Sequence, residues 1–131
     1  MEMLSLSLQG RDSNMIKPAD PRQLAVDLLP RSTCSVQVSA VIADRHGIFS
    51  WGWNGVGTGY GEHAEAAAIR RANKRRLRGS IIYVVARRQK SGNSIYTRPC
   101  DDCMALLRAY RVRMVIYREK DNYWTVEGLG R

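Results

Sequence analysis

Two pairs of residues, far apart in the chain, constrain its fold more than any other feature. His63 and Glu65 stand in a His-Ala-Glu sequence, and Cys100 and Cys103 follow Pro99 in a Cys-x-x-Cys sequence. Imidazole and thiolate are ligands that zinc prefers, and a catalytic zinc has three protein ligands in a tetrahedron whose fourth corner takes water. A zinc site shared by His63, Cys100 and Cys103 requires a fold that brings both segments together.

The spacing of the two cysteines suits the first turn of a helix, where residues three apart lie on one side. Pro99 suits the start of that helix, because it lacks the N–H that would be left unpaired there. The partial positive charge of a helix N-terminus favours the thiolate, which is the form that binds a metal. Glu65 lies only two residues from His63 and should not bind the same metal. It can instead carry a proton between a metal-bound water and a substrate.

Other kinds of site remain open for the cysteine pair. A Cys-x-x-Cys sequence also occurs as a thioredoxin-type redox pair or as half of a structural zinc site. A four-cysteine site is excluded, because the chain contains three cysteines. A closed site made by His46, His63, Cys100 and Cys103 is possible, but it leaves Glu65 without a role.

Together, the His-x-Glu and Pro-Cys-x-x-Cys sequences match the signature of the zinc deaminases. Residues 35–117 resemble the cytidine and deoxycytidylate deaminase superfamily. The likeness is greatest to the branch with His-Ala-Glu, which includes deoxycytidylate deaminases, tRNA adenosine deaminases and polynucleotide cytidine deaminases. The resemblance implies Zn²⁺ as the cofactor, His63, Cys100 and Cys103 as its ligands, and Glu65 as the catalytic acid and base.

The resemblance also implies an α/β fold of three layers, with helices on both faces of a mixed central sheet of about five strands. The hydrophobic patterns agree with this fold. They predict helices over 21–29, 63–77 and 100–110, and strands over 34–43, 48–53, 81–86 and 112–117. Cys34 is expected to be a core residue of its strand, and the run 81–86 is typical of a buried parallel strand.

The end of the chain raises a question about the branch. If residues 123–126 form a fifth strand, it should run antiparallel to the fourth, because the connection 118–122 is too short for a crossover helix. In the superfamily an antiparallel last strand goes with the branch that acts on free nucleosides, which does not agree with the His-Ala-Glu sequence. A truncated C-terminus is the simpler interpretation, and the question stays open here.

Five residues are candidates for substrate contact. Asn54 lies in a glycine-rich loop that resembles the Gly-x-Asn loop of the deaminases, whose Asn contacts the sugar or the base. Trp53 and Tyr60 flank this loop, and their rings can stack on a base or, for Trp53, pack in the core. Ala64 lies beside the ligand His63. Arg98 can bind a phosphate with two hydrogen bonds, or pair with one of the aspartates at 101 and 102.

Length and composition indicate one domain, residues 1–131, with 1–19 as a loosely ordered tail and 118–131 as a short C-terminal extension. No apolar run approaches the length that spans a membrane. The first residues lack the basic region and the long apolar core of a signal peptide. We therefore expect a cytoplasmic protein with reduced thiols, which favours zinc over a disulfide.

The net charge of +9 has two interpretations. It indicates either an anionic partner, which would be a phosphorylated nucleotide or nucleic acid, or a basic surface that keeps the protein soluble. Many of the cations fall on one side of the helix predicted over 63–77, and that side is either a solvated face or a phosphate track. They are Arg70, Arg71, Lys74, Arg75 and Arg78. A second basic stretch, residues 87–94, is either the tip of a hairpin or a loop that contacts the substrate.

The favoured hypothesis is zinc-dependent hydrolysis of cytosine to uracil in a free nucleotide or nucleoside, of the CMP or dCMP type. Residues 52–55 favour it, because Gly-Trp-Asn-Gly resembles the Gly-Tyr-Asn-Gly of deoxycytidylate deaminases. The alternative is a cytidine or adenosine in single-stranded DNA or RNA, which the charge favours. A catalytically silent zinc-bound module is a third hypothesis, and Glu65 argues against it. The sequence leaves the oligomeric state open.

Overall fold

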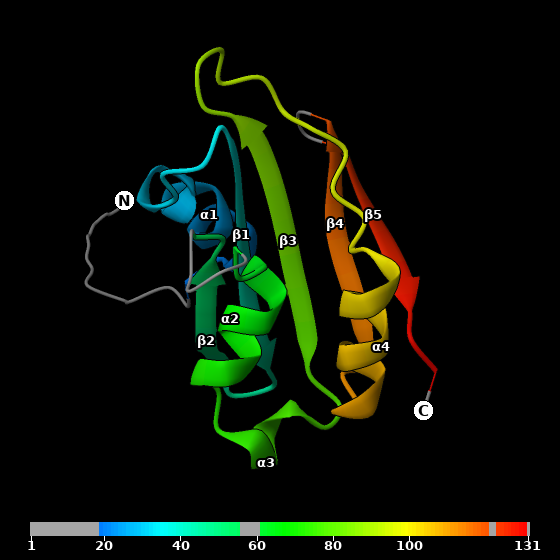
Figure 1. The fold of residues 1–131 in the computed structure, drawn as a ribbon. Helices are drawn as coiled ribbons and strands as arrows, with labels where there is room; N and C mark the ends of the chain where they lie inside the picture. Colours follow the sequence, from blue (N-terminus) through cyan, green and yellow to red (C-terminus); the bar gives the residue numbers. More distant parts are fainter. Residues whose placement is uncertain (1–18, 56–60, 121–122, 131) are drawn as a thin grey trace, which may run out of the picture.

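The computed structural model describes residues 19–55, 61–120 and 123–130. They form a five-stranded sheet with helices packed on its two faces (Figure 1). The helical elements are α1 (Pro21–Leu28), a short 3-10 turn (Leu29–Arg31), α2 (Ala64–Arg71), α3 (Lys74–Leu77) and α4 (Asp101–Ala109). The strands are β1 (Val36–Asp44), β2 (Gly47–Trp53), β3 (Ile81–Arg88), β4 (Met114–Lys120) and β5 (Tyr123–Gly128). Each helix in these described ranges is too short or too polar to cross a lipid bilayer.

The sheet is mixed, as expected, with the strand order β2-β1-β3-β4-β5. The central strand β3 runs antiparallel to β1 and parallel to β4. The apolar run 81–86 was predicted to be a buried parallel strand. Both faces of β3 are covered, but the parallel direction holds only for its pairing with β4. The last strand, β5, exists and runs antiparallel to β4, which is the direction expected from the short connection between them.

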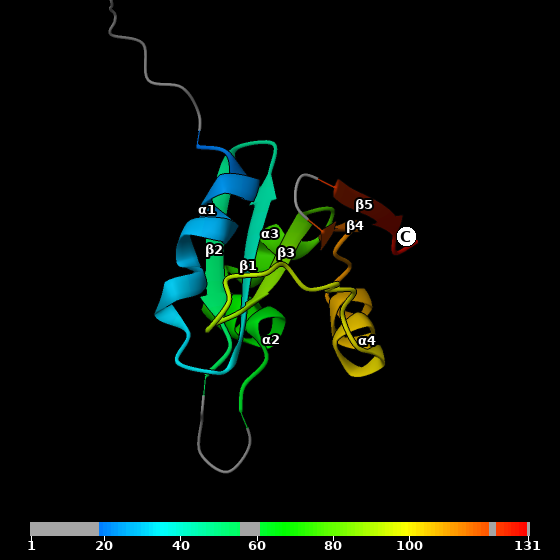
Figure 2. The same ribbon diagram turned by 90° about the horizontal axis from the view of Figure 1, so that it is seen from above.

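Two hydrophobic cores lie on opposite faces of this sheet, so the molecule has three layers (Figure 2). On one face, α2 and α4 pack on side chains such as Ile42 and Val84. On the other face, α1 packs on their neighbours Val41 and Val85. Successive side chains of a strand point to opposite faces. The two apolar faces predicted for the strand at 34–43 are thus confirmed, and each is covered by helix.

The first helix begins at Pro21, as predicted, and ends at Leu28, one residue before the predicted end. Asp20 caps it by accepting a hydrogen bond of 2.9 Å from the backbone N–H of Arg22, and Pro21 occupies the first position. Pro30 falls in the 3-10 turn that follows. Cys34 differs from the expectation, because β1 begins at Val36 and the Cys34 side chain is only half-buried in the preceding bend.

The single helix predicted over 63–77 is wrong, because the chain leaves the helical conformation at Ala72 (φ −76°, ψ 150°). The side chain of Asn73 then accepts a hydrogen bond of 3.0 Å from the backbone N–H of Arg75 and caps the separate helix α3. An Asn side chain competes in this way with a continuing helix. The basic side chains predicted to share one side of a long helix are therefore divided between two helices.

Candidate metal and substrate site

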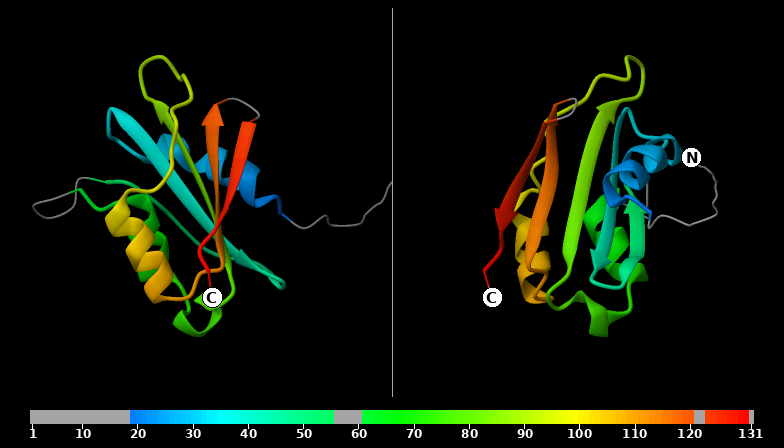
Figure 3. Two further views of the ribbon diagram at one scale, coloured as in Figure 1. Left: turned by 90° about the vertical axis from the view of Figure 1, so that its right-hand side faces the viewer. Right: turned by 180° about the vertical axis from the view of Figure 1, so that it is seen from behind.

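The candidate metal ligands meet where the N-terminal ends of α2 and α4 lie over the same face of the sheet (Figure 3). His63 is the N-cap of α2, and Cys100 is the N-cap of α4. Cys103 lies one turn further along α4, on the same side as Cys100, and is buried. β3 and the segment after it separate the two helices in the sequence, and the fold brings the predicted residues together.

The distances in this group fit a tetrahedral zinc ion. The Nδ1 atom of His63 lies 3.2 Å from the Sγ atom of Cys103 and 3.7 Å from the Sγ atom of Cys100. Zinc bonds of about 2.0–2.1 Å to nitrogen and about 2.3 Å to sulfur, at a tetrahedral angle, put such atoms about 3.6 Å apart. The two observed distances lie on either side of that value. Three ligands leave a fourth corner free for water.

Glu65 lies in the first turn of α2, two residues after His63, and is 5% exposed. Burial raises the pKa of its carboxyl group, and a backbone hydrogen bond and the nearby His63 oppose that rise only partly. It does not belong to the group of three ligands. A buried carboxyl group with a raised pKa, beside a metal-bound water, is suited to accept a proton and to donate it again.

The Cys103 thiol is held in its protonated form when no metal is bound. Burial raises the pKa of Cys103, and the neighbouring groups Glu65 and Cys100 raise it further. A metal binds the thiolate, so binding must release this proton. The site therefore gains metal and loses a proton in the same step.

His46 lies far from this group, in the turn between β1 and β2, where its backbone N–H donates to Asp44. The closed site of two histidines and two cysteines is therefore not formed. Cys34 does not belong to the group of three ligands. Among the described residues, the one group that could hold a metal ion consists of the three residues that the two sequence motifs predict.

A pocket of about 250 Å³ opens beside the metal ligands. Three of the predicted substrate contacts, Asn54, Ala64 and Arg98, line it together with His63 and Glu65. Pro99 and Cys100 of the cysteine motif also line it. The sequence analysis did not name the other lining residues as parts of a site, namely Val36, Val38, Ala86, Ile95, Tyr96 and Thr97. Their positions follow from the pairing of β1 with β3 and from the path of residues 95–99, which local patterns do not specify.

Asn54 is fixed by three hydrogen bonds. Its side-chain oxygen accepts from the hydroxyl of Ser32 at 2.6 Å and from the backbone N–H of Val38 at 2.9 Å. Its side-chain nitrogen donates to the carbonyl oxygen of Val36 at 2.9 Å. These bonds use one of the two amide N–H groups. Asn54 therefore holds the end of β2 against β1 and also lines the pocket.

Arg98 binds neither of the aspartates considered for it. Its Nε and Nη2 atoms donate to the two carboxylate oxygens of Glu127 on β5, each at 2.9 Å. The pKa of Glu127 falls because of these hydrogen bonds. The pair joins the last strand to the segment that carries Cys100, a partner that no local pattern could indicate.

Trp53 does not reach the pocket. It packs on the α1 side of the sheet. The guanidinium groups of Arg31 and Arg71 lie over its ring, 5.4 and 4.6 Å from the centroid. The core alternative that the sequence left open for Trp53 is the one observed. Tyr60 lies outside the described residues.

The basic stretch 87–94 forms the tip of a hairpin. The backbone N–H of Arg88 donates to the carbonyl oxygen of Asn93 at 2.9 Å, and that of Ile95 donates to Ala86 at 3.1 Å. Gly92 adopts a positive φ of 74° in the tip. The hairpin is closed before the chain reaches the pocket at Ile95, and the alternative of a substrate-contacting loop is not supported by the pocket lining.

A close approach between β2 and α2 sets the position of His63 and Glu65. A Cβ atom placed on Gly52 would lie 2.7 Å from the backbone nitrogen of Ala68 and 2.8 Å from the Cβ of Ala67. The hydroxyl of Ser50 donates to the carbonyl oxygen of Ala68 at 2.6 Å. Glycine at position 52 thus lets α2 lie directly against the strand.

Residues 20–119 match the family described as the cytidine and deoxycytidylate deaminase zinc-binding region. The chain belongs to this family. The match contains both halves of the metal site and most of the pocket. A search of curated proteins found no significant match.

Solved structures of deaminases share the fold. Cytidine deaminase from Burkholderia pseudomallei superposes with a TM-score of 0.66 at 18% identity, over 83% of this chain and 90% of that one. The dCMP deaminase from the cyanophage S-TIM5 gives a TM-score of 0.59 at 22% identity, over 78% of this chain and 82% of that one. At such identities the likeness is one of fold and does not show the substrate.

Proposed function

We propose that this protein is a zinc-dependent deaminase that hydrolyses cytosine to uracil in a free nucleotide or nucleoside of the CMP or dCMP type. The observation that carries the proposal is the buried carboxyl group of Glu65 beside three zinc-type ligands at the base of an open pocket. A purely structural zinc site has no use for this acid.

In this proposal His63, Cys100 and Cys103 hold the zinc ion. When bound, the ion supplies hydroxide at neutral pH by lowering the pKa of a water molecule. Glu65 would take one proton from the attacking water and deliver it to N3 of the cytosine ring while the oxygen of that water bonds to C4. Glu65 would then carry the remaining hydroxyl proton from C4 to the exocyclic amine, so that the C4–N bond breaks, the C4 carbonyl forms and ammonia leaves. Water and cytosine are consumed, and uracil and ammonia are formed.

Two features favour a free nucleotide or nucleoside. The last strand is antiparallel to β4, and in the superfamily that direction accompanies the branch that acts on free nucleosides. A structure of the cyanophage dCMP deaminase is a complex with dCMP and dUMP, and it superposes on this chain with a TM-score of 0.54 at 21% identity, over 75% of each chain. In the proposed complex, Asn54 and Ala64 contact the nucleoside and Arg98 lies nearest to its phosphate.

The test compares dCMP, CMP, deoxycytidine and a cytosine-containing single-stranded oligonucleotide as substrates of the zinc-loaded protein. We expect release of ammonia from the nucleotides or the nucleoside. Glu65→Gln should abolish turnover, by about 10³-fold or more, while the protein still binds one zinc ion. Equal activity of Glu65→Gln and the unchanged protein would contradict the mechanism.

A polynucleotide substrate is the second candidate, and the net charge of +9 favours it. The same assay separates the two candidates. Binding of a polynucleotide weakens steeply with salt because bound counterions are released. Turnover of the oligonucleotide alone, falling sharply between low and moderate salt, would replace the first proposal by the second. Zinc binding without turnover of any substrate would indicate the silent module.

A further inference from the structure

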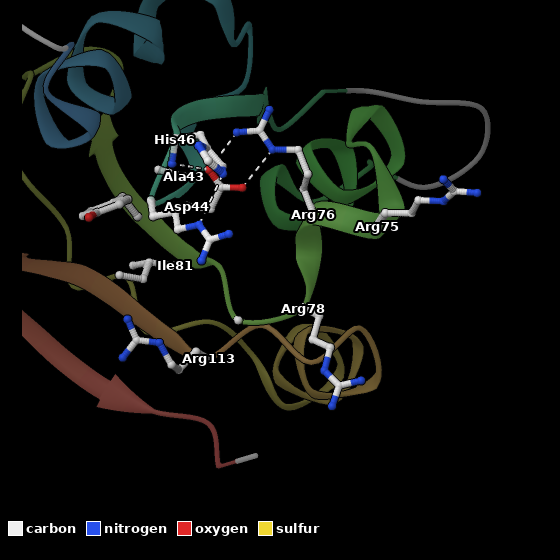
Figure 4. A pocket seen from close by; sticks show the side chains of 11 residues that line it. Ala43, Asp44, His46, Arg75, Arg76, Arg78, Ile81 and Arg113 are labelled. Carbon is white, nitrogen blue, oxygen red and sulfur yellow. Dashed lines mark hydrogen bonds and ion pairs between the residues drawn. The ribbon is translucent and has the colours of Figure 1, made fainter.

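An arginine-lined hollow of about 670 Å³ lies at the end of the sheet that carries the β1–β2 turn (Figure 4). It is enclosed by the β1–β2 turn, by α3 and by the starts of β3 and β4. Its lining contains five arginines, namely Arg45, Arg75, Arg76, Arg78 and Arg113. None of the cations in this lining is a lysine. The arginine side chain matches phosphate with two parallel hydrogen bonds, whereas lysine acts as a point charge.

A second hollow of about 320 Å³ adjoins the first. The two share Arg78, Gly79 and Arg113, and the second adds Arg111. The backbone holds these residues in place, because the N–H of Gly79 donates to the carbonyl oxygen of Arg111 and the N–H of Arg113 donates to that of Ser80, both at 2.8 Å. The two hollows therefore form one basic surface, built on hydrogen-bonded turns.

Little of this positive charge is neutralised within the described parts of the chain. Asp44 is the one acidic residue among those that line the two hollows. Asp44 forms an ion pair with Arg76, whose guanidinium donates to both carboxylate oxygens at 2.7 and 2.8 Å. Within the described ranges, no ion pair involves Arg75, Arg78 or Arg113.

The directions of the side chains favour an extended ligand over a compact one. Figure 4 shows Arg76 turned towards Asp44, while Arg75 on α3, Arg78 just after α3 and Arg113 just before β4 extend in different directions. A single small polyphosphate would require their guanidinium groups to converge on one point. Groups spread along a surface instead fit a chain of phosphates at intervals.

We propose that this surface binds the sugar–phosphate backbone of single-stranded nucleic acid, a function separate from the proposed deamination. The surface lies well away from the catalytic pocket. Ile81, at the start of β3, lines the first hollow, and Ala86, near the end of the same strand, lines the pocket. Five residues of extended strand span about 17 Å. A bound strand therefore does not have to place a base in the catalytic pocket.

The test uses the full chain loaded with zinc and a fluorescent oligothymidylate, which contains no cytosine or adenine for the catalytic site to act on. Its dissociation constant is measured by anisotropy over a range of salt concentrations. The test variant is Arg75→Gln with Arg113→Gln. The matched control is Arg88→Gln with Lys90→Gln, which removes the same charge from exposed residues of the hairpin at the other end of β3.

We expect the unchanged protein to bind oligothymidylate with a steep salt dependence. For single strands, log K falls by about 0.7 per decade of salt for each phosphate contact. Loss of two contacts should therefore reduce the slope by about 1.4. Relative to the unchanged protein, the variant should lose about 25-fold more affinity at 0.1 M salt than at 1 M salt. The control should retain the slope of the unchanged protein. Deamination of dCMP should be the same in all three proteins, which also shows that the variants are folded.

Three results would overturn the proposal. The first is that the protein does not bind oligothymidylate at low salt. The second is that binding weakens equally in the test and control variants, which would indicate an effect of net charge alone. The third is binding of inorganic tripolyphosphate, dependent on Arg75 and Arg113, by a protein that does not bind the oligonucleotide. None of these results bears on whether dCMP is deaminated, so failure here is distinct from failure of the proposed function.

Discussion

Replacement of Gly52 by alanine tests how the close approach of β2 and α2 controls the metal site. The new Cβ would lie 2.7 Å from the backbone nitrogen of Ala68, 2.8 Å from the Cβ of Ala67 and 3.0 Å from the carbonyl oxygen of Ala64. Ordinary contacts of a Cβ atom begin at 3.4 Å, so the nearest backbone atom must retreat by about 0.7 Å. No side-chain rotation relieves the contacts, because two of the three atoms belong to the backbone. The helix must move instead.

Two effects follow from this movement. Overpacking of a filled interior typically costs about 1–3 kcal/mol of unfolding free energy. The movement also carries His63, at the start of α2, away from its place beside Cys100 and Cys103 on α4. Metal–ligand distances tolerate only about 0.2 Å. A shift of about 0.7 Å is large on that scale, so zinc affinity and turnover should fall more than stability alone would explain.

Gly128→Ala is the matched control, because Gly128 lies in β5 with no atom within 4 Å of its added Cβ. Denaturant unfolding gives the free energy for both variants, and competition with a chromophoric chelator gives their zinc affinity. The control should remain within about 0.5 kcal/mol of the unchanged protein. The reasoning fails if Gly52→Ala matches the control in both stability and zinc affinity.

Three further predictions concern the Arg98–Glu127 pair, the Asp44–Arg76 pair and the bound zinc. Glu127→Gln removes the negative partner of Arg98, so the KM for dCMP should fall relative to that for deoxycytidine; an unchanged ratio would show that Arg98 does not reach the phosphate. Asp44→Asn should lower the unfolding free energy by about 1 kcal/mol at pH 7. The hydrogen bond from Arg76 lowers the pKa of Asp44 to about 2, so this difference is present above about pH 4, the unfolded value, and should disappear as the pH falls to about 2; a difference that is constant with pH would contradict this. Removal of zinc by a chelator should lower the Tm, and addition of zinc should restore it, because the metal binds the folded state; Cys103→Ser should reduce that response.

The parts of the fold and site that the sequence predicted are those with a local chemical cause. Asp20 caps the first helix, which begins at Pro21, and the short connection to the last strand required its antiparallel direction. His63, Cys100 and Cys103 were predicted to lie close together, because imidazole and thiolate groups are the ligands that zinc prefers.

The errors arose where two patterns competed or where the partner is distant in sequence. The apolar spacing across 63–77 favoured one helix, but the Asn73 side chain caps a new one after Ala72. The partner of Arg98 lies 29 residues away, on a strand whose existence was itself in question. Trp53 is the last residue of β2, an edge strand with a bulge in its pairing with β1, so alternation alone could not decide which face its ring would cover.

The hairpin that follows β3 has a consequence for changes in chain length. Its base is fixed by the hydrogen bonds of Arg88 with Asn93 and of Ile95 with Ala86, while residues 90–92 at the tip are exposed. Added or deleted residues at the tip therefore leave the base, and with it the path to Cys100, in the same place. The position is suited to carry a peptide tag or a fluorescent label without loss of the metal site, and it is a natural place for related chains to differ in length.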